Sequence, residues 1–376
     1  MKQVIHAAVF RCVFICCLCG NLNADWRDDY AAAKGFKLEI DSQGYRFPTA
    51  IAFVPNPGSS PDSPLYFVTE IRGRILVVSN DRTVRTFAED FFKLEPVLEL
   101  PEVAGEIGMA GLCLHPETGY VFVSYAYEDE AGLYRNGISR FETVPGEFGL
   151  QPSSHTQLAP ILKNILSAVS HQIGPMAIHD DYLYVAIGDA EVALESSDIN
   201  SVRGKILRMT LDGLPAPGNP HAVDDDPDKA RNYVWASGLR NPFSLKIVNG
   251  DVYVADNGPG VDRFIRVQAG DDFLYDGSNE SIAINPLYMW SPAVSPVQMD
   301  HNRELAEKAG FPEFWADSFI ITLSGVPSAP PGESDRGAKS VTSLGVDLRA
   351  GKVSRPPRLL LKYVGYDQQL PVGAAC

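Results

Sequence analysis

The sequence has few cysteines outside its first residues, few basic residues for its number of acidic ones, and no long helical period. Four of the six cysteines lie between positions 12 and 19, so only Cys113 and Cys376 remain and no disulfide framework holds the fold. The chain carries 32 Lys and Arg against 47 Asp and Glu, a formal net charge of −15. Because phosphate backbones and anionic membranes bind to basic surfaces, this balance argues against nucleic acid as a partner.

Common signatures of enzyme sites are missing as well. The sequence has no Walker loop, no G-x-G-x-x-G, no H-E-x-x-H and no G-x-S-x-G. The acidic run at residues 224–228 has neither the spacing nor the glycine of an EF-hand loop, and it is typical of a solvated loop.

The first 24 residues are typical of a secretory signal peptide. They begin with a basic residue, Lys2, continue with the apolar run Cys12–Cys19, which is far shorter than the ~20 residues that span a bilayer, and end at the small Ala24. We therefore expect a mature chain of residues 25–376 that is secreted or periplasmic and has no membrane span. Without residues 1–24 its net charge is −17. The alternative is an N-terminal strand or anchor.

A β-rich unit recurs along the rest of the chain. Each copy has an apolar run, a turn, and a hydrophobic–aromatic–hydrophobic triplet that leads into another apolar strand. The triplet centres are separated by 56, 62, 69 and 67 residues, and they are Tyr66, Phe122, Tyr184, Tyr253 and about residue 320. In the fourth copy Asn249-Gly250 joins two alternating strands, which is the strongest short signal for a hairpin. Repeats of this length predict the four-stranded blades of a β-propeller. The alternative is an irregular β-sandwich.

Counting forward from the fifth copy, a sixth blade would begin near Leu370, and the chain stops at Cys376. We therefore expect a single all-β domain over residues 25–376, a six-bladed propeller whose sixth blade is incomplete at the C-terminus. A strand at Phe36–Ile40 would help to complete it. An unfinished blade leaves an open sheet edge.

Polar residues flanked by glycine occur at matching places in successive copies. At the strand starts of several blades they would converge at one mouth of the central channel, where a toroidal fold builds its site. Each is weak alone, because an isolated His is more often structural and a Gly-Asp pair is usually a turn. The segments are GEIG from Gly105, HQIG from His171, IGD ending at Asp189, GKILR from Gly204, GLRNP from Gly238 and DNGP from Asp256.

The chain resembles the soluble pyrroloquinoline quinone (PQQ)-dependent glucose and aldose sugar dehydrogenases, the glucose/sorbosone dehydrogenase family. The resemblance runs from about Phe47 to Asp276 and is carried by GEIGMAGLCLHP, HQIGPMAIHDDYLYVAIGD, GKILRMTLDG, ASGLRNPFSL and ADNGPG, in that order. It implies a six-bladed propeller with PQQ over the channel mouth. It also implies a secreted quinoprotein oxidoreductase that oxidises the C1 hydroxyl of an aldose sugar, transfers hydride to PQQ, and passes electrons to an external acceptor.

The resemblance also implies roles for individual residues. His171 would be the general base that removes the sugar hydroxyl proton, a task that suits an imidazole. Arg240 would act in catalysis by stabilising charge that develops on the quinone. The other implied roles are cofactor binding by Arg240, Asn241, Gln172 and Lys205, sugar binding by Glu106 and Asp189, and binding of a Ca²⁺ ion by Gly258, Pro259 and Asp262.

Three positions depart from the family pattern. Arg263 stands where the family commonly has an acid, so it would either weaken the Ca²⁺ site by like-charge repulsion or pair with a cofactor carboxylate. Ser170 precedes His171 where the glucose enzymes carry an acid, so we expect the histidine to lack a carboxylate partner there. Ile173 stands where many members have a small residue.

Two hypotheses follow for the function. The first is a Ca²⁺- and PQQ-dependent sugar dehydrogenase. The second is a propeller of the same family that has lost catalysis and binds a glycan or a protein. A different propeller chemistry, such as a metal-dependent lactonase, is the remaining alternative. The sequence does not indicate the sugar, the electron acceptor or the oligomeric state.

Overall fold

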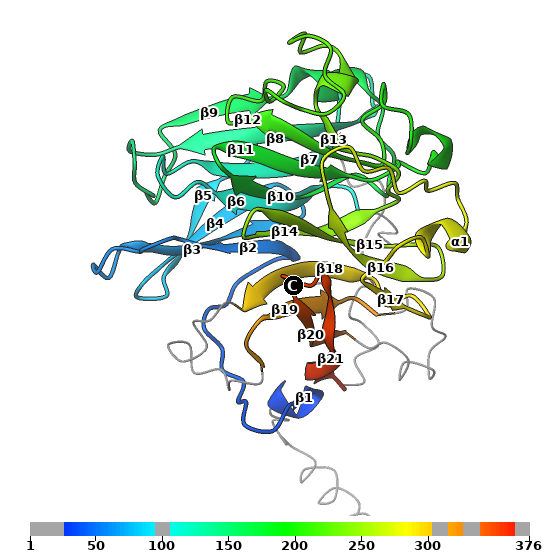
Figure 1. Ribbon diagram of the computed structural model, residues 1–376. Coiled ribbons are helices and arrows are strands. Elements are labelled where there is room, and N and C mark those ends of the chain that lie inside the picture. The colour runs from blue at the N-terminus through cyan, green and yellow to red at the C-terminus, as the bar shows by residue number, and fades with distance from the viewer. Residues whose placement is uncertain (1–25, 95–105, 303–314, 326–338, 365–376) are drawn as a thin grey trace, which may run out of the picture.

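The computed structural model describes residues 26–94, 106–302, 315–325 and 339–364, and these form five antiparallel sheets (Figure 1). The first sheet contains β2 (Pro48–Phe53), β3 (Pro64–Glu70), β4 (Arg74–Ser79) and β5 (Val84–Ala88). The second contains β6 (Met109–Leu114), β7 (Val121–Glu128), β8 (Tyr134–Glu142) and β9 (Ser154–Leu158). The third contains β10 (Ile173–His179), β11 (Tyr182–Ile187), β12 (Lys205–Thr210) and β13 (Val234–Ala236).

The last two sheets differ in their number of strands. The fourth contains β14 (Pro242–Val248), β15 (Asp251–Asp256), β16 (Asp262–Val267) and β17 (Tyr288–Trp290). The fifth has five strands, which are β18 (Pro296–Asn302), β19 (Ser318–Leu323), β20 (Ser340–Asp347), β21 (Lys352–Tyr363) and β1 (Tyr30–Ala32). The described helical segments are short: α1 (Asn279–Ile282), η1 (Trp26–Asp29), η2 (Pro160–Asn164), η3 (Ala193–Glu195) and η4 (Ala230–Asn232).

These sheets confirm the repeat and the propeller class. Each predicted triplet lies on the second strand of a sheet, at β3, β7, β11, β15 and β19. The hairpin at Asn249-Gly250 also forms: Val248 pairs with Asp251, and both turn residues have positive φ, at 53° and 84°. This is the backbone that a two-residue turn between twisted strands requires.

The number of blades differs from the prediction. The described residues form five blades rather than six, and Phe36–Ile40 is not a strand. The N-terminal strand is instead β1, which pairs with the outer strand β21 of the fifth sheet through Tyr30 and Tyr363. It therefore covers the edge of an existing blade. The residues expected to open a sixth blade, near Leu370, lie outside the described residues.

The hydrophobic core lies between consecutive blades. One cluster joins the first and second blades around Phe67 and Val123, the next joins the second and third around Phe122 and Leu207, and equivalent clusters join the later pairs. The strands β2, β6, β10, β14 and β18 pack side by side in that order and line a central cavity of about 590 Å³. Gln298, which lines this cavity, donates from Nε2 to Thr49 O at 2.9 Å and so links the fifth blade to the first.

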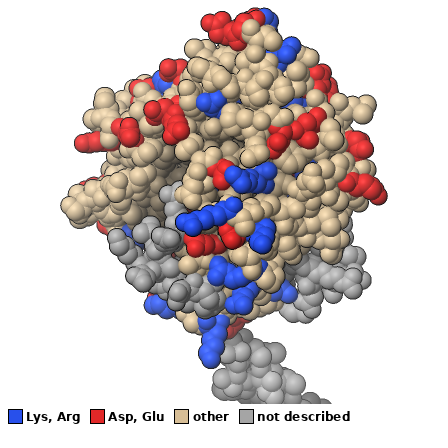
Figure 2. All heavy atoms as spheres, viewed as in Figure 1, with Lys and Arg blue, Asp and Glu red and all other residues tan. Residues whose placement is uncertain are grey.

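Charge is distributed unevenly on the face shown in Figure 2. Acidic side chains are scattered over the upper blades, and basic side chains gather lower down over the fifth sheet. Strand β21 of that sheet carries Lys352, Arg355, Arg358 and Lys362. Within the part of the chain that the structure describes, no helix is long and apolar enough to cross a membrane.

Candidate functional site

Three inner strands begin beside the residues that the sequence singled out. Glu106 precedes β6, His171 directly precedes Gln172 and β10, and Arg240 and Asn241 directly precede β14. Hydrogen bonds join these strand starts: the His171 N–H donates to Glu106 Oε2 at 2.8 Å, and Asn241 Nδ2 donates to Glu106 Oε1 at 3.0 Å. The predicted convergence at one mouth of the channel is therefore present for blades two, three and four.

His171 is held as an oriented imidazole. Its Nδ1 lies 2.7 Å from Asp189 Oδ1, and the two side chains are 14% and 3% exposed. A carboxylate can only accept here, so the proton lies on Nδ1 and the lone pair of the neutral ring lies on Nε2. Among the residues that the structure describes, Nε2 has no hydrogen-bond partner. The ring is thus ready to accept a proton from a ligand.

The expectation that His171 lacks a carboxylate partner was wrong. Position 170 is indeed Ser, but the partner comes from Asp189, which directly follows β11 and Gly188. Asp189 also accepts the Glu191 N–H at 2.9 Å and is almost fully buried. Its carboxylate therefore orients the base, and the structure gives it no direct exposure to a sugar.

The backbone at His171 is strained in a way that is common at functional sites. Its φ of 52° lies in the left-handed region, which costs energy for a residue other than glycine. Gly188 packs against it so closely that an added Cβ would lie 2.4 Å from His171 O. Glu106 compensates by accepting the His171 N–H. Burial raises the pKa of this carboxyl, although its hydrogen bonds and the nearby His171 and Arg240 oppose the rise.

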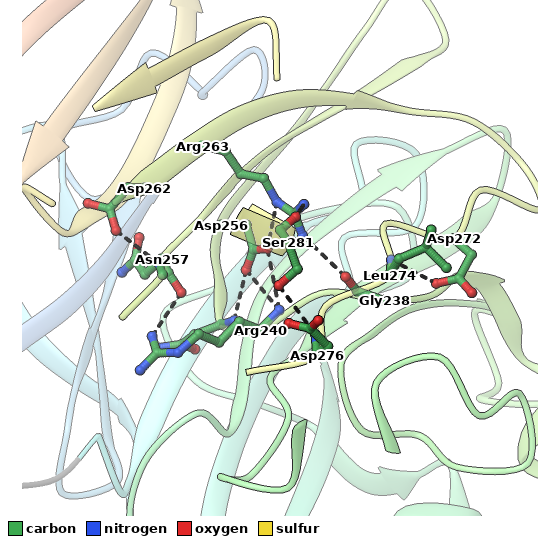
Figure 3. A network of polar contacts seen from close by, with 12 residues as sticks. Gly238, Arg240, Asp256, Asn257, Asp262, Arg263, Asp272, Leu274, Asp276 and Ser281 are labelled. Carbon is green, nitrogen blue, oxygen red and sulfur yellow. Dashed lines mark hydrogen bonds and ion pairs between the residues drawn. The ribbon is translucent and has the colours of Figure 1, made fainter. Parts of the chain in front are cut away.

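Arg240 presents a positive charge that no acid of the described residues neutralises by an ion pair. Its Nη1 donates to Asn257 O at 2.8 Å, and its side chain is partly exposed. Figure 3 shows the guanidinium directed toward Asn257 while the backbone N–H faces Asp256. In a chain with this excess of acid, an unpaired guanidinium at a channel mouth is a ready partner for an anionic ligand.

Arg263 does not pair with a cofactor carboxylate, which was the second of the two roles expected of it. Its side chain is 0% exposed and donates to Asp256, Gly238 and Ser281 inside the fourth blade. It therefore cannot reach a cofactor carboxylate at the surface, and its charge is paired with Asp256 at 2.8 Å. Asp256 and Asn257 belong to the DNGP segment, but the sequence indicated no role for them. The sequence also did not show that Asp256 accepts the N–H groups of Arg240 and Asn241, or that Asn257 O accepts from the Arg240 guanidinium.

The residues expected to bind Ca²⁺ do not supply it with a carboxylate. Asp262 is 1% exposed. Its oxygens accept three backbone N–H groups, from Gly258 at 3.0 Å, Val294 at 2.6 Å and Ser295 at 2.7 Å. Burial raises the pKa of Asp262, although these three hydrogen bonds act to lower it. No group of three His, Cys, Asp or Glu suited to a metal occurs in the described part of the chain. Of the predicted set, only the carbonyls of Gly258 and Pro259 remain as candidate metal ligands.

Three of the four expected cofactor ligands are buried, and one of them, Asn241, is 3% exposed with its Nδ2 bound to Glu106. Lys205 is fully buried, and its Nζ donates to the carbonyls of Glu195, Ser196 and Arg203 at 2.9, 2.6 and 2.5 Å. Burial lowers the pKa of Lys205 to about 8. All three ammonium protons are donated to carbonyls of the loop before β12, so Lys205 has a structural role. Gln172 is also buried; its Nε2 donates to the Ala168 carbonyl, and its Oε1 has no partner among the described residues.

Comparison with known proteins identifies the family. Residues 45–326 match the sequence model of the glucose/sorbosone dehydrogenase family. The chain belongs to this family. It is 24% identical over 274 residues to quinoprotein glucose dehydrogenase B of Acinetobacter calcoaceticus, covering 60% of this chain and 53% of that protein. It is 24% identical over 164 residues to the aldose sugar dehydrogenase YliI of Escherichia coli, covering 38% and 42% of the two chains.

The chain thus spans about half the length of the curated relatives it matches. Among solved structures, the PQQ-bound form of an aldose sugar dehydrogenase from Streptomyces coelicolor aligns with a TM-score of 0.60 at 19% identity, over 88% of this chain and 84% of that one. At this identity the structural match shows the fold. It agrees with the family assignment and with the propeller built from the sequence repeats.

Proposed function

We propose that this glucose/sorbosone dehydrogenase-family protein is a PQQ-dependent oxidoreductase that oxidises the C1 hydroxyl of an aldose sugar. The observation that carries the proposal is the channel mouth, where an oriented His171–Asp189 pair lies next to an unpaired Arg240. Family membership and the PQQ-bound relative support the choice of reaction. The external electron acceptor belongs to the same proposal.

The residues at the mouth fit an anionic quinone. PQQ carries three carboxylates, and Arg240 offers a guanidinium with no acidic partner among the described residues. Two buried amide oxygens, Gln172 Oε1 and Asn257 Oδ1, lack partners among the described residues; because an amide oxygen only accepts, each would take a donor such as a sugar hydroxyl and not a carboxylate. Arg240 and Asn241 would hold the cofactor, which when bound supplies an acceptor for the hydride from the sugar C1.

The chain's own residues supply the proton transfer. His171 Nε2 would accept the proton of the sugar C1 hydroxyl, so that loss of this proton and of the C1 hydride converts the aldose to its lactone. Asp189 would hold the ring and stabilise the imidazolium that forms. Glu106, which is partly exposed and fixes the His171 backbone, would face the sugar side.

Calcium and export are separate parts of the proposal. A Ca²⁺ ion would depend on the Gly258 and Pro259 carbonyls, because the Asp262 oxygens accept three backbone N–H groups.

The basic start and short apolar run of residues 1–24 support secretion or a periplasmic location. N-terminal sequencing of the natural protein tests export, with Asp25 as the expected first residue.

The experiment that tests the activity adds PQQ, with and without Ca²⁺, to the purified protein and follows dye reduction with a panel of aldoses. We expect sugar-dependent reduction in the wild type and its loss in His171→Ala. His179→Ala is the matched control, because His179 ends the same strand β10 that begins next to His171, at the other end of the channel. No dye reduction by a folded wild type that binds PQQ would favour the non-catalytic binding module.

A further inference from the structure

The buried pair of Arg263 and Asp256 contacts the loop that carries Arg240 and Asn241, and Figure 3 shows Asp256 between Arg263 and Arg240. Asp256 ends β15, and Arg263 is its cross-strand partner on β16. Both side chains are 0% exposed, and Arg263 Nε and Nη2 donate to Asp256 Oδ2 at 3.0 and 2.8 Å. Because the attraction within a fully buried ion pair does not reliably exceed the desolvation cost, stability alone is a poor explanation for it.

The second oxygen of Asp256 is directed at the loop. Asp256 Oδ1 accepts the N–H of Asn241 at 2.8 Å and the N–H of Arg240 at 3.2 Å. Two amide donors on one carboxylate fix the two peptide units, and these units set the directions in which both side chains leave the backbone. The guanidinium keeps the carboxylate in place by binding its other oxygen.

Arg263 also holds the first residue of the same loop. Its Nη2 donates to Gly238 O at 3.2 Å, and its Nη1 donates to Ser281 O in α1 at 3.2 Å. Gly238 has a φ of 76°, and an added Cβ would lie 2.2 Å from Asp272 Oδ1. One planar guanidinium therefore secures the loop 238–241 at its start, directly, and at its end, through Asp256. A lysine, with a single nitrogen, cannot reproduce this fork.

The loop in turn contacts the acids that hold the base. Arg240 O accepts the Asp189 N–H at 2.7 Å, and Asn241 Nδ2 donates to Glu106 Oε1 at 3.0 Å. Asp189 orients the His171 ring, and Glu106 binds its backbone N–H. A shift of the loop would therefore displace both the unpaired guanidinium and the supports of the imidazole.

We propose that Arg263 is a positioning residue that, through Asp256, fixes the loop 238–241 and thereby places Arg240 and Asn241 at the cofactor site. The proposal rests on the proposed function, because it takes PQQ as the ligand of that loop. It assigns a use to the basic residue that stands where the family commonly has an acid.

The test compares Arg263→Lys with Arg266→Lys. Arg266 is a matched control on the same strand, since its Nη2 pairs with Asp251 Oδ1 at 2.5 Å across the same two strands, with both side chains about 30% exposed. Two quantities are measured in each: amide hydrogen exchange of a peptide covering residues 238–245 in protein without PQQ, and the Kd for PQQ by titration.

We expect R263K to exchange faster at 238–245 and to bind PQQ about 10- to 100-fold more weakly, the range typical of residues that orient metal ligands. R266K should match the wild type in both. Unchanged exchange in a folded R263K overturns the proposal. If the wild type itself does not bind PQQ, the proposed function fails, and faster exchange in R263K still supports the positioning of the loop.

A double variant separates positioning from stability. Asp256→Asn with Arg263→Met leaves no unpaired buried charge, so we expect it to fold with stability near that of the wild type even if R263K does not fold. A merely structural pair predicts wild-type PQQ affinity in this variant. The positioning role predicts weaker PQQ binding and faster exchange at 238–245, because the guanidinium that held the side chain at position 256 and donated to Gly238 O is gone.

Discussion

Replacement of Asp189 by Asn is the sharpest perturbation of the proposed proton transfer. Asp189 Oδ1 accepts from His171 Nδ1 at 2.7 Å in a site where the carboxylate is 3% exposed. An asparagine amide in the same place can donate to Nδ1, which moves the ring proton to Nε2 and removes the lone pair that faces the ligand. A general base contributes ~10²–10⁴ in rate, so the expected loss corresponds to about 3–5 kcal/mol of barrier.

The assay is dye-coupled sugar oxidation at saturating PQQ, together with a PQQ titration. We expect D189N to lose kcat by about 10²–10⁴ while its Kd for PQQ stays unchanged, since Asp189 meets the cofactor loop only through its backbone N–H. Asp180→Asn is the matched control, because Asp180 faces His179 Nε2 at 3.4 Å in an exposed pair. Combining D189N with His171→Ala should add little further loss, as for residues that act as a unit. Wild-type kcat in folded D189N would refute the role of this pair.

Two further predictions concern ionisable groups whose pKa is shifted by desolvation. Burial raises the pKa of Glu106 above its ordinary value of 4.5, so the folded chain binds more protons than the unfolded chain between these two pKa values. The free energy of unfolding of the wild type, relative to that of E106Q, should therefore fall as the pH rises through this interval. A difference between the two proteins that stays constant with pH in urea titrations would contradict this. The pKa of Lys205 is lowered to about 8, so between pH 8 and 10.5 the unfolded chain binds more protons than the folded one. Relative to K205M, the wild type should gain roughly 3 kcal/mol over that interval, and no gain would show that this ammonium is not penalised by burial.

The repeats and the hairpin were predictable because they depend on local patterns. Apolar triplets at spacings near 60 residues mark the second strand of each blade, and Asn249-Gly250 supplies two positive φ angles at low cost. The edge strand β1 was not predictable, because three residues, Tyr30–Ala32, carry no periodicity and its partner β21 lies at the other end of the sequence.

The residues that make up the site could be predicted from the sequence, but most of the contacts between them could not. Glu106, His171 and Asn241 were expected to meet because glycine-flanked polar residues begin successive inner strands, and hydrogen bonds now join them. The Asp189 partner and the inward Arg263 depend on how neighbouring blades pack. Successive residues of a strand point to opposite faces, so Asp262 and Arg263 bind different groups. Both faces of β16 are buried, so its sequence alone does not show which partner each side chain contacts.

Direct titration of PQQ into the purified protein tests the central claim most directly. We expect saturable binding of one PQQ per chain, measured by the cofactor's absorbance, and a large loss of affinity in Arg240→Ala with the free energy of unfolding nearly unchanged. The partly exposed guanidinium of Arg240 and its bond to Asn257 O are the reason for this expectation. PQQ binding that is equally strong in Arg240→Ala, or no binding by a folded wild type with Ca²⁺ present, would contradict the account.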